Sequence, residues 1–228
     1  MKLEILSLCK SYKKRSVLEN ISFEAESGEI IGIVGGNGCG KSTMLSILAG
    51  VSSPDSGSFK VNGVDLFKNK KNLSSVIGYV PQNPVLFEEL SGKDNLYLWY
   101  DKKTLETALS QDGLLSMLEI KPFMDKTVSK MSGGMKKRIS IACAVSAKPE
   151  ILLLDEPSSA LDLPCKEKLY GWYKKYTAGG GTIIVATHDT RELELCTKVF
   201  VLKNNQLSPY NYTGNINELA GYFEQDGN

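Results

Sequence analysis

The chain has 228 residues, 42% of them hydrophobic and 23% charged, which is ordinary for a globular protein of one large domain or two small ones. Its formal net charge of +1 argues against nucleic acid as a partner, because proteins that bind nucleic acid usually carry a basic excess. The N-terminus lacks the apolar run of a secretory signal, and no window holds the ~18 apolar residues of a membrane-spanning helix, so we expect a cytoplasmic protein that reaches a membrane only through a partner.

The first third of the chain reads as strands and turns with one helix among them. Apolar patches on either side of a basic turn predict strands within residues 1–30, and the apolar run 30–34 predicts a buried strand that leads into a glycine-rich loop. Apolar side chains at helical spacing predict a helix over 42–49. Two turns and a short strand are expected after it, at 54–57, 62–63 and 77–80.

The rest of the chain is predicted to be helical at first and then to alternate between strands and helices. Leucines recur at helical separations from about 84 to 130, and a further helix is expected over 135–147. Short apolar runs and amphipathic segments then alternate, which is typical of a parallel sheet covered by helices. These elements are strand 151–154, helix 164–177, strand 182–187, helix 189–196 and strand 198–202. We predict an α/β fold in one domain over 1–228, with an inserted helical lobe at approximately 84–147 and a small polar appendage from 205.

A glycine-rich loop at 35–42 matches the pattern G-x-x-x-x-G-K-[ST] of phosphate-binding loops. Glycines let backbone N–H groups approach phosphate oxygens, and a helix that begins at Lys41 adds its dipole to the anion site. Lys41 would reach the β- and γ-phosphates, and Ser42 would give its hydroxyl to Mg²⁺. The loop therefore predicts ATP and Mg²⁺ as cofactors. Its residues are Gly35, Gly36, Asn37, Gly38, Cys39, Gly40, Lys41, Ser42 and Thr43.

Two carboxylates, Asp155 and Glu156, follow the apolar strand 151–154. In a parallel sheet such a strand end faces the crevice where ligands bind. Asp155 would hold Mg²⁺, directly or through water, and Glu156 would polarise the attacking water. The alternative, a solvated acidic turn after a core strand, is weakened by the phosphate-binding loop earlier in the chain.

Three further features narrow the class of nucleotide-binding protein that the sequence predicts. Ser132, Gly133 and Gly134 open a helix and so form a second anion-binding terminus, which two chains facing each other could lend to one another's nucleotide. Gln82 follows a short strand at the junction with the helical lobe, where it could reach the metal or the water. His188, the only histidine, follows the strand 182–187, where a γ-phosphate contact could be made.

These motifs and their order resemble the nucleotide-binding subunit of an ATP-binding cassette (ABC) transporter over essentially the full length of the chain. The resemblance implies a P-loop NTPase core with a RecA-like parallel sheet, an N-terminal antiparallel β subdomain and an inserted α-helical lobe. It also implies that Tyr12 stacks on adenine. The family's elements would be Walker A at 35–43, the Q-loop residue Gln82, the signature motif at Ser132-Gly133-Gly134, Walker B at Asp155 with the catalytic base Glu156, the D-loop at 159–162 and the switch histidine His188.

The signature motif departs from the family's usual Leu-Ser-Gly-Gly-Gln, because this chain has methionine at both ends, Met131 and Met135. The serine and glycines that would touch phosphate are kept, so the departure concerns a ribose or loop contact. The run from Gly133 to Arg138 is similar to that of subunits paired with small exporter-type membrane proteins, including drug and antibiotic exporters. This similarity favours export.

We therefore expect an ATPase subunit that forms a homodimer or heterodimer around ATP-Mg²⁺ and drives integral membrane subunits from the inner face of the cell membrane. A second hypothesis is a soluble ABC-type ATPase acting on DNA, the ribosome or cofactor assembly; the single cassette and low net charge speak against it. A P-loop kinase or GTPase would have no use for the second anion site.

Two further expectations concern side chains outside these motifs. The basic run Lys136, Lys137 and Arg138 is expected to be a solvated face. The aromatic residues of the helical lobe are mostly expected in its core, with some lining a groove for a membrane partner next to the Q-loop. They are Phe87, Tyr97, Trp99 and Tyr100.

Overall fold

In the computed structural model, residues 1–110 and 113–224 are described, apart from the side chains of 70–72 and 223–224; the rest of the predicted 1–228 domain lies outside the described residues. A first, antiparallel sheet has the strand order β2-β1-β4-β5. Asn62 and Gly63, both with positive φ, form the two-residue turn between its last two strands, as the Asn-Gly signal predicts. The strands are β1 (Lys2–Tyr12), β2 (Arg15–Glu26), β4 (Ser56–Val61) and β5 (Val64–Asp65).

The second sheet has six strands, and all neighbouring pairs that the structure describes are parallel except the pair β9–β10. Every residue of β3, β7 and β8 is buried, as expected for strands covered on both faces. This arrangement confirms the predicted RecA-like sheet. The strands lie in the order β10 (Gln206–Tyr210), β9 (Lys198–Lys203), β3 (Ile30–Val34), β8 (Thr182–Ala186), β7 (Ile151–Asp155) and β6 (Ile77–Val80).

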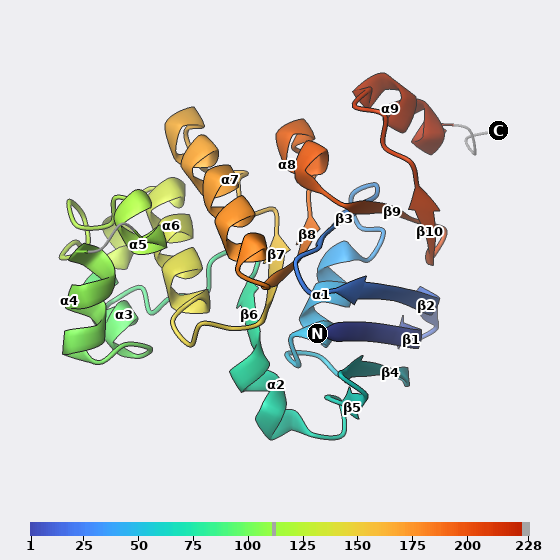
Figure 1. Ribbon diagram of the computed structural model, residues 1–228, viewed down its shortest axis with the longest axis horizontal. Coiled ribbons are helices and arrows are strands. Elements are labelled where there is room, and N and C mark those ends of the chain that lie inside the picture. The colour runs from blue at the N-terminus through green and yellow to red at the C-terminus, as the bar shows by residue number, and fades with distance from the viewer. Residues whose placement is uncertain (111–112, 225–228) are drawn as a thin grey trace.

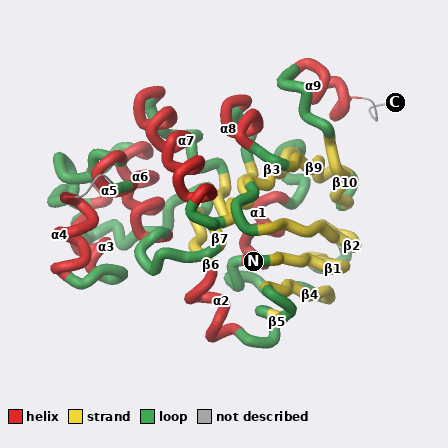
Figure 2. Tube along the Cα trace, in the orientation of Figure 1, coloured by secondary structure: helices red, strands yellow, loops and turns green. Residues whose placement is uncertain are grey.

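The helical lobe lies to one side of this sheet, and the antiparallel strands lie to the other side (Figure 1). Figure 2 shows the lobe as helix and loop without strands. Helical structure begins later than the expected residue 84, because 83–91 are loop and turn and the first helix starts after a capping box between Ser91 and Asp94. The helices of the lobe are α3 (Gly92–Tyr97), α4 (Lys102–Ser110), α5 (Leu114–Met117) and α6 (Gly133–Ala144).

The remaining helices flank the two sheets. The helix α2 was not predicted from the sequence, since residues 54–81 read as strand and turn. The C-terminal segment is more than a polar appendage, because β10 pairs with β9 and Leu219 of the last helix is 3% exposed. No helix among the described residues is long and apolar enough to cross a membrane. These helices are α1 (Lys41–Leu48), α2 (Lys70–Val76), α7 (Leu163–Ala178), α8 (Thr190–Leu195) and α9 (Ile216–Glu224).

The parallel sheet separates two hydrophobic cores. Alternate residues of a strand face opposite sides, so Leu152 and Leu154 of β7 pack into the core shared with the lobe and α7. Ile151 and Leu153 pack into the core shared with α1 and the antiparallel sheet. Each subdomain is therefore fixed to the same strands whose ends carry the site described below.

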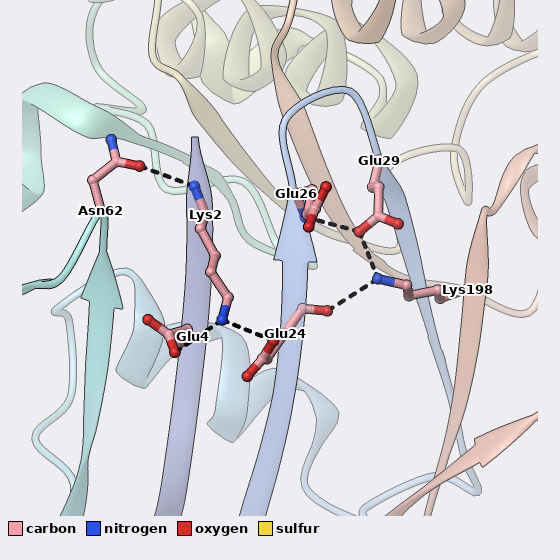
Figure 3. Close-up of polar contacts among 7 residues, drawn as sticks. All are labelled: Lys2, Glu4, Glu24, Glu26, Glu29, Asn62 and Lys198. Carbon is pink, nitrogen blue, oxygen red and sulfur yellow. Dashed lines mark hydrogen bonds and ion pairs between the residues drawn. The ribbon is translucent and has the colours of Figure 1, made fainter.

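Polar contacts also join the two sheets at the edge shown in Figure 3. Lys198, at the start of β9, donates to a carboxylate oxygen of Glu29 at 2.8 Å and to the main-chain oxygen of Glu24 in β2 at 3.5 Å. Glu29 also accepts the Glu26 N–H at 2.8 Å. On the neighbouring strand, Lys2 pairs with both Glu4 and Glu24. The contacts of Lys198 hold the antiparallel sheet against the beginning of β9, and those of Lys2 lie within the antiparallel sheet.

Candidate functional site

The candidate site lies at the carboxyl ends of four neighbouring strands, β3, β8, β7 and β6. The phosphate-binding loop follows β3, His188 follows β8, Asp155 and Glu156 end β7, and Gln82 follows β6. Residues from 35 to 188 are therefore brought to one edge by strand order alone. Ligands of open parallel α/β sheets bind at this edge.

The phosphate-binding loop takes a conformation that only its glycines accept easily. Gly38 and Gly40 have φ values of +77° and +116°, in the left-handed region. Gly40 is also the N-cap of α1, and it has no side chain to occupy the N–H groups of the first helical turn. The first residues of α1 lie at the site, where the helix dipole favours an anion.

Lys41 is the first residue of α1 and is 8% exposed. Its ammonium group donates to the main-chain oxygens of Gly35 at 2.6 Å and Gly36 at 3.2 Å. These bonds fold the side chain back over the loop, so the positive charge lies beside the pocket rather than in open solvent.

A pocket of about 140 Å³ opens between the loop and the carboxylates. Glycine, hydroxyl, amide, ammonium and carboxylate groups line it, which suits a phosphate chain and a hard cation. Its lining residues are Asn37, Gly38, Gly40, Lys41, Ser42, Thr43, Gln82, Asp155 and Glu156.

Asp155 is 2% exposed, and burial raises the pKa of its carboxyl group. A hydrogen bond with Ser42, the charges of Lys137 and Lys41 and the backbone N–H of Gln82 all oppose this shift. The oxygens of Ser42, Asp155 and Gln82 form a donor set that fits Mg²⁺, which takes few protein ligands when it also binds phosphates. Among the described residues, no group of three or more His, Cys, Asp or Glu side chains could hold a metal by itself.

Glu156 begins the turn after β7, with a φ of 48°. Its N–H donates to the main-chain oxygen of Ala186 at 2.9 Å, which ties this turn to the end of β8. One carboxylate oxygen lies 3.6 Å from Nε2 of His188. Burial and the charge of Lys41 lower the pKa of His188, while burial raises the pKa of Glu156. The Glu156 carboxyl group and the His188 imidazole therefore face each other at the end of the two strands.

The signature residues lie outside this pocket. Ser132 is the exposed N-cap of α6 and accepts the N–H of Met135 at 3.3 Å. A Cβ atom on Gly134 would lie 2.7 Å from the main-chain oxygen of Ala160, so the close approach of these two segments requires glycine. Ser132 does not line the pocket that contains Lys41. A single chain therefore does not complete the predicted site, in which Ser132 of a second chain faces the nucleotide.

Several other predicted site residues also fall outside the pocket lining: Tyr12, Gly35, Gly36, Cys39 and His188. Tyr12 is 49% exposed at the end of β1, in the hairpin whose other strand brings Val17 against Gly40. Cys39 packs its side chain against the core beneath the loop, and its N–H donates to the main-chain oxygen of Gly36 at 3.2 Å. Any phosphate contact by Cys39 would come from its backbone.

The basic run of α6 is not the solvated face that the sequence suggested. Lys137 is 1% exposed and donates to the main-chain oxygens of Pro81 and Gln82. Burial lowers the pKa of Lys137, and the carboxylates of Asp155, Glu156 and Glu192 oppose that shift. The prediction was wrong because helical periodicity does not say which basic residue of a run faces the core.

The aromatic residues of the lobe also differ from expectation. Tyr100 is buried, with its hydroxyl bonded to the main-chain oxygen of Ala142 at 2.8 Å. Phe87 and Trp99 are 60% and 64% exposed, and Tyr97 is 38% exposed. Most of this set is therefore on the surface.

Glu192 in α8 is a buried acid that sequence reasoning missed, since one glutamate on a short helix is usually solvated. It is 1% exposed and accepts hydrogen bonds from Thr187 and, at 3.4 Å, from Tyr173. Thr187 in turn accepts the N–H of Asp189 at 2.9 Å. Glu192 thus holds both sides of the turn that carries His188.

Burial raises the pKa of Glu192 from 4.5 to about 7, which predicts a pH-dependent effect of Glu192→Gln on stability. The folded chain binds an extra proton between these values, so its stability falls as pH rises through that window. The glutamine variant does not lose stability in this way. Its free energy of unfolding relative to wild type should therefore rise from pH 5 to pH 8. The rise should be at most about 3 kcal/mol, since each pKa unit corresponds to about 1.4 kcal/mol. Thermal unfolding at both pH values measures this difference. Glu194→Gln, at an exposed position in the same helix, should show no such trend; a difference for Glu192→Gln that does not change with pH would contradict the assignment.

Comparisons with known proteins find relatives that cover most of the chain. A family model described as "ABC transporter" matches residues 18–159, and one described as "AAA domain, putative AbiEii toxin, Type IV TA system" matches the shorter segment 125–194. The chain is 31% identical over 212 residues to a probable sulfate/thiosulfate import ATP-binding protein CysA of Chlorella vulgaris, covering 91% of this chain and 89% of the relative. It is 32% identical over 210 residues to the Nod factor export ATP-binding protein I of Sinorhizobium fredii, covering 90% of this chain and 61% of that relative.

The fold is similar to solved structures as well. A dimeric structure of the ATP-binding cassette MJ0796 in a post-hydrolysis state, bound to ADP and Pi, aligns with a TM-score of 0.81 at 27% identity. The alignment covers 92% of this chain and 99% of that one. The relatives thus include both import and export proteins, and the structural neighbour is a dimer.

Proposed function

The chain belongs to the ABC transporter ATP-binding family, and from this premise we propose that it closes as a dimer on two ATP-Mg²⁺ and drives transport through separate membrane subunits. One observation carries the proposal most directly. Lys41, Gln82, Asp155 and Glu156 line one pocket, while Ser132 lies exposed outside it. A second chain that presents its own Ser132 would complete the site.

In this proposal each residue has a distinct task. Lys41 and the loop N–H groups bind the phosphates, and Tyr12 stacks on adenine. Ser42, Gln82 and Asp155 would hold Mg²⁺, which when bound neutralises charge on the phosphates. Glu156 polarises the attacking water, and His188, at 3.6 Å from it, steadies the γ-phosphate and the water.

The whole chain, 1–228, would act as a single nucleotide-binding domain with its helical lobe at approximately 84–147. The partner cassette is a second copy or a related chain, since both half-sites are present here. The chain would lie in the cytoplasm, held at the inner face of the membrane by its partners. Export is the direction that we propose, on the similarity of the run from Gly133 to Arg138 to exporter subunits; the import relative makes import the alternative.

A coupling surface for the membrane subunits is proposed at the beginning of the lobe. It consists of Val85, Phe87 and Leu90, which are 85%, 60% and 38% exposed and follow closely on Gln82. Exposed apolar residues grouped in this way are typical of protein interfaces. Leu86, between them, instead packs partly against the core.

The substitution Phe87→Asp should abolish at least about nine-tenths of ATP-driven transport, because a buried unpaired carboxylate in an interface weakens binding by several kcal/mol. ATP binding by the isolated chain should not change. Transport by the reconstituted complex and nucleotide affinity of the purified chain are the two measurements. Val51→Asp, at a position 73% exposed beyond α1, is the matched control.

Unchanged transport by the Phe87→Asp complex would contradict the coupling surface. The alternative function, a soluble ABC-type ATPase, predicts instead that no membrane subunit binds the chain or stimulates its hydrolysis. Copurification with membrane subunits and the ATPase rate in their presence separate the two functions.

A further inference from the structure

Lys137 links two parts of the site that the motifs describe separately. It lies in α6, in the helix that Ser132 caps, and its side chain is almost fully buried. The ammonium group donates to the main-chain oxygen of Gln82 at 2.7 Å and to that of Pro81 at 3.0 Å. The helix of the signature motif is thus bonded directly to the backbone of the loop after β6.

The Gln82 backbone lies between Lys137 and Asp155. Its carbonyl accepts from Lys137 at 2.7 Å, and its amide helps to lower the pKa of the Asp155 carboxyl group. The carboxylates of Asp155, Glu156 and Glu192 all lie near enough to stabilise the positive charge of Lys137. A buried ammonium group with two carbonyl acceptors and compensating carboxylates is a specific arrangement, since an unpaired buried charge would be strongly unfavourable.

The neighbouring lysine, Lys136, shows how a basic residue of the same run behaves on the surface. Lys136 has a side chain that is 24% exposed and pairs with Glu88 on the lobe surface at 2.8 Å. It makes no contact with the pocket lining in the described part of the chain. The two lysines are adjacent and have the same charge and length. Lys136 pairs with a surface carboxylate, whereas Lys137 donates to the backbone of the loop after β6.

We propose that Lys137 is a positioning residue that transmits the position of the Gln82 backbone to the N-terminus of α6, and thereby to Ser132. This role rests on the proposed function, in which Gln82 senses the chain's own nucleotide and Ser132 serves the partner's. Binding of nucleotide at one site would then move the surface offered to the other site through two hydrogen bonds from one side chain.

The test is hydrogen–deuterium exchange of the full chain, monomeric and at low concentration, with and without ATP-Mg²⁺. A Glu156→Gln background prevents hydrolysis during labelling. In that parent, ATP-Mg²⁺ should change exchange both in the loop 81–88 and in the segment 131–138. In Lys137→Met the change should remain at 81–88 and fall at least fivefold at 131–138, with ATP affinity within threefold of the parent. Lys137→Arg, which keeps the donors, should restore at least half of the change, and Lys136→Met should match the parent.

An equal response of 131–138 in the parent and in Lys137→Met overturns the proposal, and so does a parent in which that segment never responds. If Lys137→Met does not fold, Lys137→Ala decides between the same two outcomes, because it also removes the ammonium donors. The proposed function is judged separately, by ATP-dependent dimerisation of the parent at high concentration. Loss of dimerisation in the parent with an intact exchange response would count against the function and not against the role of Lys137.

Discussion

Replacing Glu156 with Gln should lower the rate of ATP hydrolysis by about 10²–10⁴-fold, the usual contribution of a positioned general base. The carboxylate lines the pocket and lies 3.6 Å from His188, whereas an amide cannot take a proton from water. The substitution keeps the size of the side chain and leaves the phosphate-binding loop intact. ATP should therefore still bind, and the ATP-bound dimer should accumulate.

Steady-state phosphate release measures the first effect, and light scattering during gel filtration with ATP-Mg²⁺ measures the second. Glu167→Gln, on the exposed face of α7, should leave both properties at the wild-type level. A Glu156→Gln protein that hydrolyses ATP at the wild-type rate would refute the role given to Glu156.

Replacing Lys41 with Ala should weaken ATP binding by about 100-fold or more, since each hydrogen bond to a charged group contributes about 1.5–3 kcal/mol and 1.4 kcal/mol is tenfold. The ammonium group lies at the pocket, held by the main-chain oxygens of Gly35 and Gly36. No other residue of the lining carries a positive charge. The negative phosphate chain therefore loses its only cationic partner among the described pocket residues.

Equilibrium titration with a fluorescent ATP analogue measures the affinity of Lys41→Ala, and thermal unfolding shows whether the loop still folds. Lys102→Ala, an exposed lysine at the start of α4, is the control for a general loss of positive charge. Retention of wild-type affinity in Lys41→Ala would place the phosphates elsewhere in the protein.

The fold was largely predictable because its central strands are buried on both faces. Continuous apolar runs such as residues 151–154 of β7 can only be core, and turn residues mark where they end. The short helices of the lobe and α2 were harder to predict. They have few turns each, and tertiary contacts decide their boundaries.

The residues of the candidate site were predictable where a local pattern carries the chemistry. The loop around Lys41 and the strand end at Asp155 are such patterns, and topology brings them together. Lys137 and Glu192 could not be predicted in this way. Their burial depends on which side of a short helix meets the sheet, and a single charged residue gives no signal of that.

The structure also separates Ser132 from the pocket, so the proposed ATP site needs two chains. Mixing experiments can test it with two inactive variants, Lys41→Ala and Ser132→Arg. A dimer of one chain of each kind contains one intact site. The Ser132→Arg chain supplies Lys41 to that site, and the Lys41→Ala chain supplies Ser132. Its other site carries both substitutions.

The decisive measurement is therefore the ATPase rate of an equimolar mixture of the Lys41→Ala and Ser132→Arg chains, with each variant alone as reference. A site shared between two chains predicts that the mixture regains activity well above either variant alone. A mixture no more active than its components, although both variants are folded, would contradict the shared site.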